Sequence, residues 1–325
     1  MDKMNNNSGA FVISLDFELF WGVWDVTSKD KYCNHILGVQ KVIPGLLELF
    51  RRYDIKATFA IVGFLFAKNK TELLQYLPEL KPGYSETNLN VYLKELDQIG
   101  ENEQDDPFHF GYSLFEMIIN SPHEICTHTF SHYYCLETGQ TAAEFDADIK
   151  AAKKIAEAKG INLTSIVFPR NQVNAAYMAV LKNNGIRVYR GNPTSWIYRP
   201  RKFSAEVLFI RLCRLLDTYF PISGYNTSRV PDSKDLPVNI PAGHFLKPYD
   251  KRFAWLEHLK LKRIMNEMTK AAQRGDTYHL WWHPHNFGIN LTKNMSNLSV
   301  ILDHYQLLNK KYGFENKTMQ EAAGI

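Results

Sequence analysis

The sequence predicts an α/β protein built from repeated β/α units, and two observations support this. Short apolar segments of strand length alternate with longer segments of helical periodicity, a pattern typical of parallel sheets whose connections are helices. Polar residues follow the apolar segments directly: Asp16 and Glu18 come after 11–15, and His128 comes after 124–126. In a β/α barrel, that end of the strands carries the active site.

Six apolar segments are predicted to form strands: 11–15, 57–62, 124–126, 165–168, 187–190 and 278–282. Four segments with helical periodicity are predicted to form helices: 39–53, 143–159, 177–184 and 256–274. The last three helices are each followed by a glycine, Gly160, Gly185 and Gly275. A glycine in that position closes a helix because it adopts left-handed backbone without strain.

Two segments interrupt the alternation and are expected to be insertions in one domain that spans 1–325. Residues 81–106 are polar and acidic, and we expect them to cross the mouth of the barrel. Residues 199–250 contain an apolar and basic stretch, 203–220, followed by a Pro-rich loop. A basic amphipathic helix at 203–220 could lie on a membrane surface, or it could pack on the barrel with its basic residues outward.

The composition excludes several classes of protein. The formal net charge of +4 and the absence of a basic block give no support to nucleic-acid binding. The four cysteines lack C-x-x-C spacing and are expected to be reduced thiols. Cys126 could be a metal ligand or a small buried hydrophobe. The polar segment 1–10 and the short apolar run after it do not resemble a signal peptide, so we expect a cytoplasmic location, either free or at the inner membrane surface.

The spacing of His128 and His132 indicates a metal site. Two imidazoles four residues apart reach one point if the segment is helical, and a carboxylate from elsewhere can complete a facial set of ligands. Such a set leaves coordination positions open for water and substrate. Metal-assisted hydrolysis requires this arrangement.

Taken in order, these segments resemble the polysaccharide deacetylase family, carbohydrate esterase family four. The resemblance extends from about Phe11 to about Gly288, apart from the two insertions, and rests on the motifs at 14–18, 128–132, 168–172 and 280–287. It implies a distorted (β/α) barrel of about seven parallel strands. It also implies a divalent metal, most simply Zn²⁺, with Co²⁺ or Ni²⁺ as substitutes.

The resemblance also assigns roles to individual residues. Asp16 would be the general base, and Glu18, His128 and His132 would bind the metal. The family usually has two adjacent aspartates where this chain has Asp16-Phe17-Glu18, so Glu18 could instead cap a loop or form a salt bridge. Arg170 would pair with Asp16 and orient it.

Further residues are expected to line the substrate site. His283 would be the general acid that protonates the leaving amine, and His285 is the second choice for that role or a substrate contact. Trp196 is either a wall of the pocket or a core residue. Trp281 or Trp282 could stack on a sugar, although burial in the strand is expected for at least one of them; we assign Trp282 to substrate binding.

The predicted activity is that of a metal-dependent carbohydrate N-deacetylase, a hydrolase that acts on C–N bonds other than peptide bonds. The expected substrate is an N-acylated, most simply N-acetylated, amino sugar or sugar precursor of surface polysaccharide. Two alternatives stay open. One is a deformylase or amidase acting on a lipid- or nucleotide-linked sugar or a cyclic amide, and the other is a non-catalytic sugar-binding module. The sequence does not indicate an oligomeric state.

Overall fold

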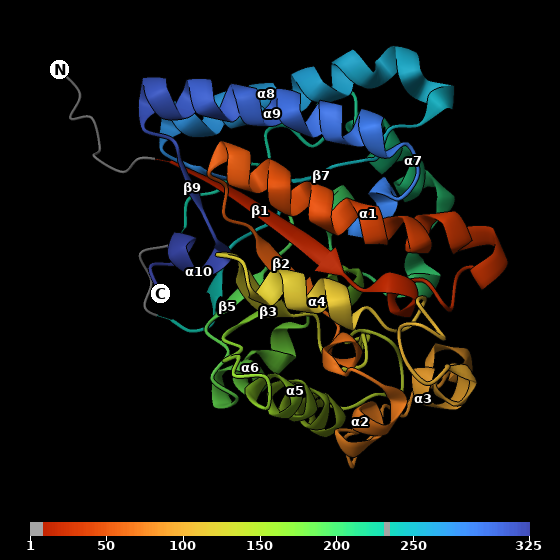
Figure 1. Ribbon diagram of the computed structural model, residues 1–325. Helices are drawn as coiled ribbons and strands as arrows, with labels where there is room; N and C mark the ends of the chain where they lie inside the picture. Colours follow the sequence, from red (N-terminus) through yellow and green to blue (C-terminus); the bar gives the residue numbers. More distant parts are fainter. Residues whose placement is uncertain (1–8, 231–234) are drawn as a thin grey trace.

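Parallel strands form the centre of the molecule in the computed structural model, which describes residues 9–230 and 235–325 (Figure 1). Segment 1–8 and residues 231–234 of the Pro-rich loop lie outside the described residues. The strands of the described part are β1 (Ala10–Phe17), β2 (Thr58–Ile61), β3 (Glu124–Thr127), β4 (Ser165–Val167), β5 (Val188–Arg190), β6 (Val238–Asn239), β7 (His244–Phe245), β8 (Thr277–Trp282) and β9 (Glu315–Lys317).

The order of the strands makes a distorted barrel. The sheet runs β6-β5-β4-β3-β2-β1-β8-β7, all in parallel, and β9 pairs with the first residues of β1. The strands β6 and β7 belong to one segment, 238–245, whose first part pairs with β5 and whose last part pairs with β8. This closing segment therefore touches both edges of the sheet. Counted with the six longer strands, it gives seven positions around the barrel, which confirms the predicted fold class.

Helices cover the outside of the barrel. Within the described residues they are α1 (Lys29–Tyr53), α2 (Lys70–Gln75), α3 (Val91–Lys94), α4 (Tyr112–Ile119), α5 (Ala142–Glu157), α6 (Met178–Asn183), α7 (Leu208–Asp217), α8 (Glu257–Arg274), α9 (Leu291–Tyr312) and α10 (Met319–Ala322). In Figure 1, α1, α8 and α9 lie on one side of the strands, and α5 and α6 lie on the opposite side. None of the helices in the described part is long and apolar enough to cross a membrane.

The six predicted strands all form, and each lies within two residues of its predicted bounds. All eight residues of β1 are buried because neighbouring strands and outer helices enclose it, as expected for a central strand of a parallel sheet. Helix α1 begins ten residues before the predicted start of 39–53. The helices α4 and α9 were not predicted.

The two expected insertions differ in how far they leave the barrel. Residues 81–106 contain α3 and short turns outside the sheet, as expected. The range 199–250 is only partly an insertion, because it contains β6 and β7 and so closes the barrel. The part that leaves the sheet is the stretch around α7, which ends before Val238.

Candidate metal-binding active site

Glu18, His128 and His132 converge on one point at the carboxyl end of the strands. The Nε2 atoms of His128 and His132 lie 3.3 and 3.2 Å from Oε2 of Glu18. One ligand atom from each of the three residues lies within 4.8 Å of the other two, and all three residues are buried. Two imidazoles and one carboxylate around a common point form a facial set of ligands that suits a divalent transition metal.

The hydrogen bonds of the two imidazoles fit a cation at this point. Nδ1 of His128 lies 2.9 Å from the carbonyl oxygen of Val167, so a neutral ring carries its proton on Nδ1 and turns the lone pair of Nε2 toward Glu18. Burial lowers the pKa of His132, although Glu18 acts in the opposite direction. A nitrogen lone pair and a carboxylate at this separation repel each other unless a cation lies between them. The donor set therefore fits the metal that the sequence predicts.

Glu18 lies between the end of β1 and the short helix that follows, and the course of the chain there sets the position of its side chain. Its side chain makes no capping hydrogen bond to the short helix η1 (Leu19–Gly22) that follows, and its ion-pair partners among the described residues are all histidines. A Cβ atom at Gly22 would lie 2.0 Å from Cδ of Glu18, so glycine leaves the space that the carboxylate occupies. Burial raises the pKa of Glu18, but the surrounding histidines outweigh this and hold the pKa well below its ordinary value.

The two histidines lie on a tight loop after β3, and the helix that their spacing favours does not form. Thr129 and His132 have φ angles of 63° and 58°, in the left-handed region that an α-helix of L-residues does not enter. This backbone, rather than a helical turn, brings the imidazole of His132 back toward that of His128. The ring centroids of the two histidines lie 5.1 Å apart.

Two neighbouring elements fix this histidine loop. The buried carboxylate of Asp148 on α5 accepts hydrogen bonds from the backbone N–H groups of Phe130 and Ser131 at 2.7 and 3.1 Å. On the other side, the N–H of Gly63 donates to the carbonyl oxygen of Thr129 at 2.8 Å. A Cβ atom at Gly63 would lie 2.7 Å from Cα of Phe130, so only glycine permits this approach.

Asp16 is held by Arg190, a residue that the sequence analysis did not assign to the site. Nη1 and Nη2 of Arg190, at the end of β5, donate to the two carboxylate oxygens of Asp16 at 2.8 and 2.7 Å. The same guanidinium donates to Ser14 and Asn171. Burial raises the pKa of Asp16, but the charge and hydrogen bonds of Arg190, with nearby histidines, lower it below the ordinary value. Asp16 is therefore ionised at neutral pH.

The predicted pair between Arg170 and Asp16 does not form, and this prediction was wrong. Arg170 forms a short ion pair with Asp25, and its guanidinium lies 4.2 Å from the ring centroid of Tyr134. Arg170 and Asn171 both have positive φ angles, 54° and 52°, so the chain turns sharply after β4. In this turn Asn171, and not Arg170, reaches the Asp16–Arg190 pair.

His283 and His285 both follow β8 and lie beside the metal ligands. Nε2 of His283 lies 3.7 Å from Oδ2 of Asp16 and 3.6 Å from Oε1 of Glu18. His285 is fully buried, and burial together with the charge of His283 lowers its pKa to about 3. The two rings stack with centroids 5.0 Å apart. A cavity lies next to the site, and of these two histidines only His283 lines it.

The tryptophans do not have the predicted arrangement. Trp282 is completely buried between Phe50 and Phe287, so the prediction that it binds substrate was wrong. Neighbouring residues of a strand point to opposite faces, and Trp281 therefore points inward, where it covers the guanidinium of Arg190 at 4.3 Å. Trp196 is neither a core residue nor a wall of the cavity, because it is half exposed and stacks on Phe209.

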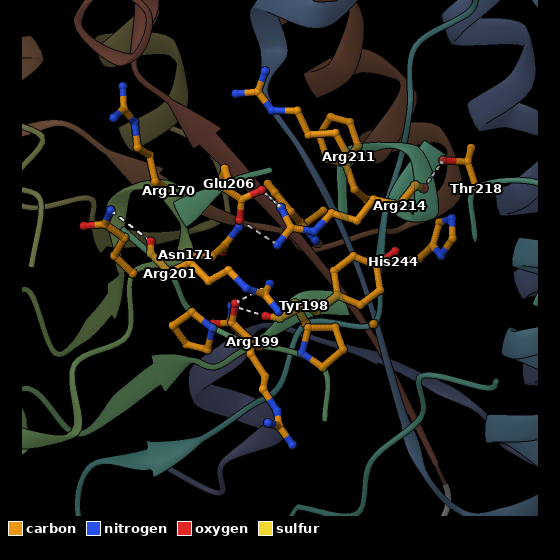
Figure 2. A pocket seen from close by; sticks show the side chains of 18 of the residues that line it. Arg170, Asn171, Tyr198, Arg199, Arg201, Glu206, Arg211, Arg214, Thr218 and His244 are labelled. Atoms are coloured by element: carbon orange, nitrogen blue, oxygen red, sulfur yellow. Dashed lines mark hydrogen bonds and ion pairs between the residues drawn. The ribbon is translucent and has the colours of Figure 1, made fainter. Parts of the chain in front are cut away.

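A cavity of about 410 Å³ adjoins the site (Figure 2). At one end it is lined by Trp281, His283 and Asn171, which belong to the strand ends around Asp16. At the other end it is lined by residues from 192–218, the stretch that contains α7. His283 therefore lies between the cluster of Glu18, His128 and His132 and a cavity that is large enough for a small molecule.

Comparison with known proteins identifies related sequences and folds. Residues 30–189 match the family model described as polysaccharide deacetylase. The match includes His128, His132 and Arg170, whereas Asp16 and His283 lie outside it. No curated protein is similar enough in sequence to count as a relative.

Several solved structures share the fold. A polysaccharide deacetylase assigned from sequence in Mycobacterium smegmatis has a TM-score of 0.61 at 10% identity, with 100% of this chain and 92% of that chain covered. The allantoinase PuuE has a TM-score of 0.56 at 10% identity, with coverages of 98% and 91%. A 4-α-glucanotransferase from Thermococcus litoralis has a TM-score of 0.51 at 10% identity, with coverages of 98% and 40%. At such low identity these similarities show the fold alone.

Proposed function

We propose that this chain, whose residues 30–189 match the polysaccharide deacetylase family model and whose fold resembles that of such a protein, is a metal-dependent hydrolase that removes an N-acetyl group from an amino sugar. The observation that carries the proposal is the convergence of Glu18, His128 and His132 beside an ionised Asp16 and a partly exposed His283. These are the ligands, the base and the acid that amide hydrolysis requires. A non-catalytic binding module would have no need of this complete set.

The side chains divide the proton transfers between them. A divalent metal such as zinc, held by Glu18, His128 and His132, would polarise the acyl carbonyl and lower the pKa of the attacking water. The carboxylate of Asp16, kept ionised by Arg190, accepts the proton of that water. The imidazole of His283 then donates a proton to the departing nitrogen, and an amine and a carboxylate leave.

A chain of hydrogen bonds supports His283, rather than His285, as the acid. The hydroxyl of Tyr32 lies 3.4 Å from Oδ1 of Asn286, and Nδ2 of Asn286 lies 3.2 Å from Nδ1 of His283. The acid form is the imidazolium, in which both ring nitrogens carry a proton. The side-chain amide of Asn286, turned so that its oxygen faces Nδ1, accepts the Nδ1 proton, while Nε2 with its own proton faces Asp16 and Glu18. His285, buried and with its pKa lowered to about 3, is a neutral imidazole at neutral pH and lacks the extra proton that a general acid gives up.

The substrate that we propose is a precursor of a surface polysaccharide, and α7 supports a location of the reaction at a membrane surface. Leu208, Phe209 and Leu212 of this helix are 81%, 63% and 49% exposed, so its apolar side faces outward instead of packing on the barrel. An exposed apolar face with nearby arginines suits the surface of an anionic bilayer. The variant Leu212→Glu should therefore bind anionic liposomes less than the wild type in a flotation assay. The cytoplasmic location stays a prediction.

The first test of the proposal is the metal content of the purified protein, measured by elemental mass spectrometry. We expect about one divalent metal per chain, lost in His128→Ala and Glu18→Ala and retained in the control variant His258→Ala, whose histidine is exposed on α8. The metal-loaded protein should then release acetate from N-acetylated amino sugars. A wild type that binds no metal after reconstitution would contradict the proposed hydrolase.

A further inference from the structure

Arginines line the cavity on several sides (Figure 2). Five of its lining residues carry a guanidinium group, and they come from the turn after β4 and from the stretch around α7: Arg170, Arg199, Arg201, Arg211 and Arg214. Glu206 is the only carboxylate among the lining residues described. The lining of the cavity therefore carries an excess of positive charge.

Two of these arginines are neutralised by carboxylates. Arg214 forms a bidentate pair with Glu206, with both Nη···Oε distances at 2.9 Å. Arg170 pairs with Asp25, a residue outside the cavity. Another nearby acid, Glu137, instead accepts hydrogen bonds from the side chain of Gln172 and from a backbone amide.

The other three arginines, Arg199, Arg201 and Arg211, form no ion pair among the described residues. The guanidinium of Arg201 is nevertheless fixed, because it donates to the backbone carbonyls of Trp196, Ile197 and Arg199. In the described part of the chain, no side-chain hydrogen bond or ion pair holds Arg199 or Arg211. Like charges that line one partly enclosed space repel each other more strongly than they would in open water, and a bound anion relieves that repulsion.

We propose that this cavity binds a phosphate or diphosphate group of the substrate through Arg199, Arg201 and Arg211, while the acylated amino group lies at His283. The proposal rests on the proposed function and defines its substrate class as a sugar phosphate ester rather than a neutral saccharide. Guanidinium groups bind phosphate oxygens with paired hydrogen bonds, and an arginine held in advance loses little freedom on binding. A volume of about 410 Å³ lies within the range of small-molecule sites.

The phosphate could belong to a nucleotide or to a lipid carrier, and the surroundings favour the lipid. Phe203 lines the cavity and is exposed on its outer side, and Leu208 and Leu212 continue the apolar surface along α7. A prenyl chain that leaves the arginines in this direction would meet an apolar surface. A nucleoside would gain nothing from this surface, so the two sources can be distinguished by experiment.

The test measures anion binding without turnover. Inorganic pyrophosphate is titrated by calorimetry into the full-length wild type, Arg201→Ala and Arg211→Ala, each in metal-loaded and chelator-treated form. We expect each substitution to weaken binding about tenfold in both forms, since each removes a charged hydrogen-bond donor. The matched control is Arg187→Ala, an exposed arginine directly before β5 at the opposite end of the strands, which should bind as the wild type does.

The outcomes separate the inference from the proposed function. Equal affinity in the wild type and both arginine variants, or binding that disappears with the metal, would overturn the phosphate subsite and leave the hydrolase standing. Arginine-dependent binding by a wild-type protein that takes up no metal even after reconstitution would keep the subsite and refute the hydrolase. Tighter binding of farnesyl diphosphate than of uridine diphosphate, together with weaker farnesyl diphosphate binding in Leu212→Glu, would assign the phosphate to a lipid carrier. Tighter binding of uridine diphosphate than of farnesyl diphosphate, with no effect of Leu212→Glu, would assign the phosphate to a nucleotide.

Discussion

Replacing Arg190 by methionine should raise the pKa of Asp16 and destabilise the protein in a pH-dependent way. The guanidinium of Arg190 donates two hydrogen bonds, at 2.8 and 2.7 Å, to a carboxylate that is otherwise buried. Methionine fills much of the same space and removes only the charge and the donors. Asp16 would then be an uncompensated buried acid, for which burial raises the pKa.

The size of the effect follows from the linkage between pKa and stability. In the wild type the pKa of Asp16 lies below its ordinary value of 3.8, so Asp16 stabilises the fold above that pH, and this stability is lost as the pH falls through the folded-state pKa. In Arg190→Met the folded-state pKa lies above the unfolded value, and the penalty appears as the pH rises. Removing one partner of a buried ion pair typically costs about 3–5 kcal/mol, and we expect a loss of this size at pH 7. Near pH 4 the difference between the two proteins should be much smaller.

Urea unfolding of the metal-free protein at several pH values measures this difference, and carbon NMR of the Asp16 carboxyl group measures the pKa directly. The matched control is Arg170→Met, which removes the ion pair with Asp25 and leaves Arg190 in place. The pKa of Asp16 should stay unchanged in the control. A rise in that pKa in Arg170→Met as large as in Arg190→Met, or a loss of stability in Arg190→Met that does not depend on pH, would refute the reasoning.

Three further substitutions test how the site is held. Gly22→Ala places a Cβ atom 2.0 Å from Cδ of Glu18 and should weaken metal binding about 10–100-fold in a chelator competition; unchanged affinity would show that the carboxylate has room to move. Asp148→Asn replaces one of the oxygens that hold the histidine loop and should lower the free energy of unfolding by about 1–3 kcal/mol, which thermal or urea unfolding would reveal. Asn286→Leu removes the partner of Nδ1 of His283 and should lower kcat about tenfold with little change in KM; a change in KM alone would assign Asn286 to substrate binding.

The convergence of Glu18, His128 and His132 could be predicted because its signal is local. His128 and His132 are four residues apart and follow a strand, and Glu18 follows another strand, so the parallel arrangement alone brings their ends together. The conformation that achieves this could not be predicted. It depends on left-handed backbone at Thr129 and His132, which Asp148 and Gly63 stabilise from other parts of the chain.

The partner of Asp16 could not be predicted in the same way, because it depends on which strand end lies across the barrel. Arg170 and Arg190 both follow or end a buried strand, and only the packed barrel distinguishes them. The one available signal was the position of Arg190, a charged residue at the last position of a strand. Trp281 and Trp282 posed a similar problem, since a shift of one residue exchanges the inward and outward faces of a strand.

The position of β8 beside β1 determines the order in which the site can be completed during synthesis of the chain. The three candidate metal ligands, Glu18, His128 and His132, follow β1 and β3, and β1, β2 and β3 are neighbours in both sequence and space. His283 comes from β8, which must pair with β1 across a separation of more than 250 residues. Contacts this distant in sequence form late. A nascent chain can therefore bring Glu18, His128 and His132 together well before His283 reaches them, and the proposed set of site residues is complete only after β8 has been made.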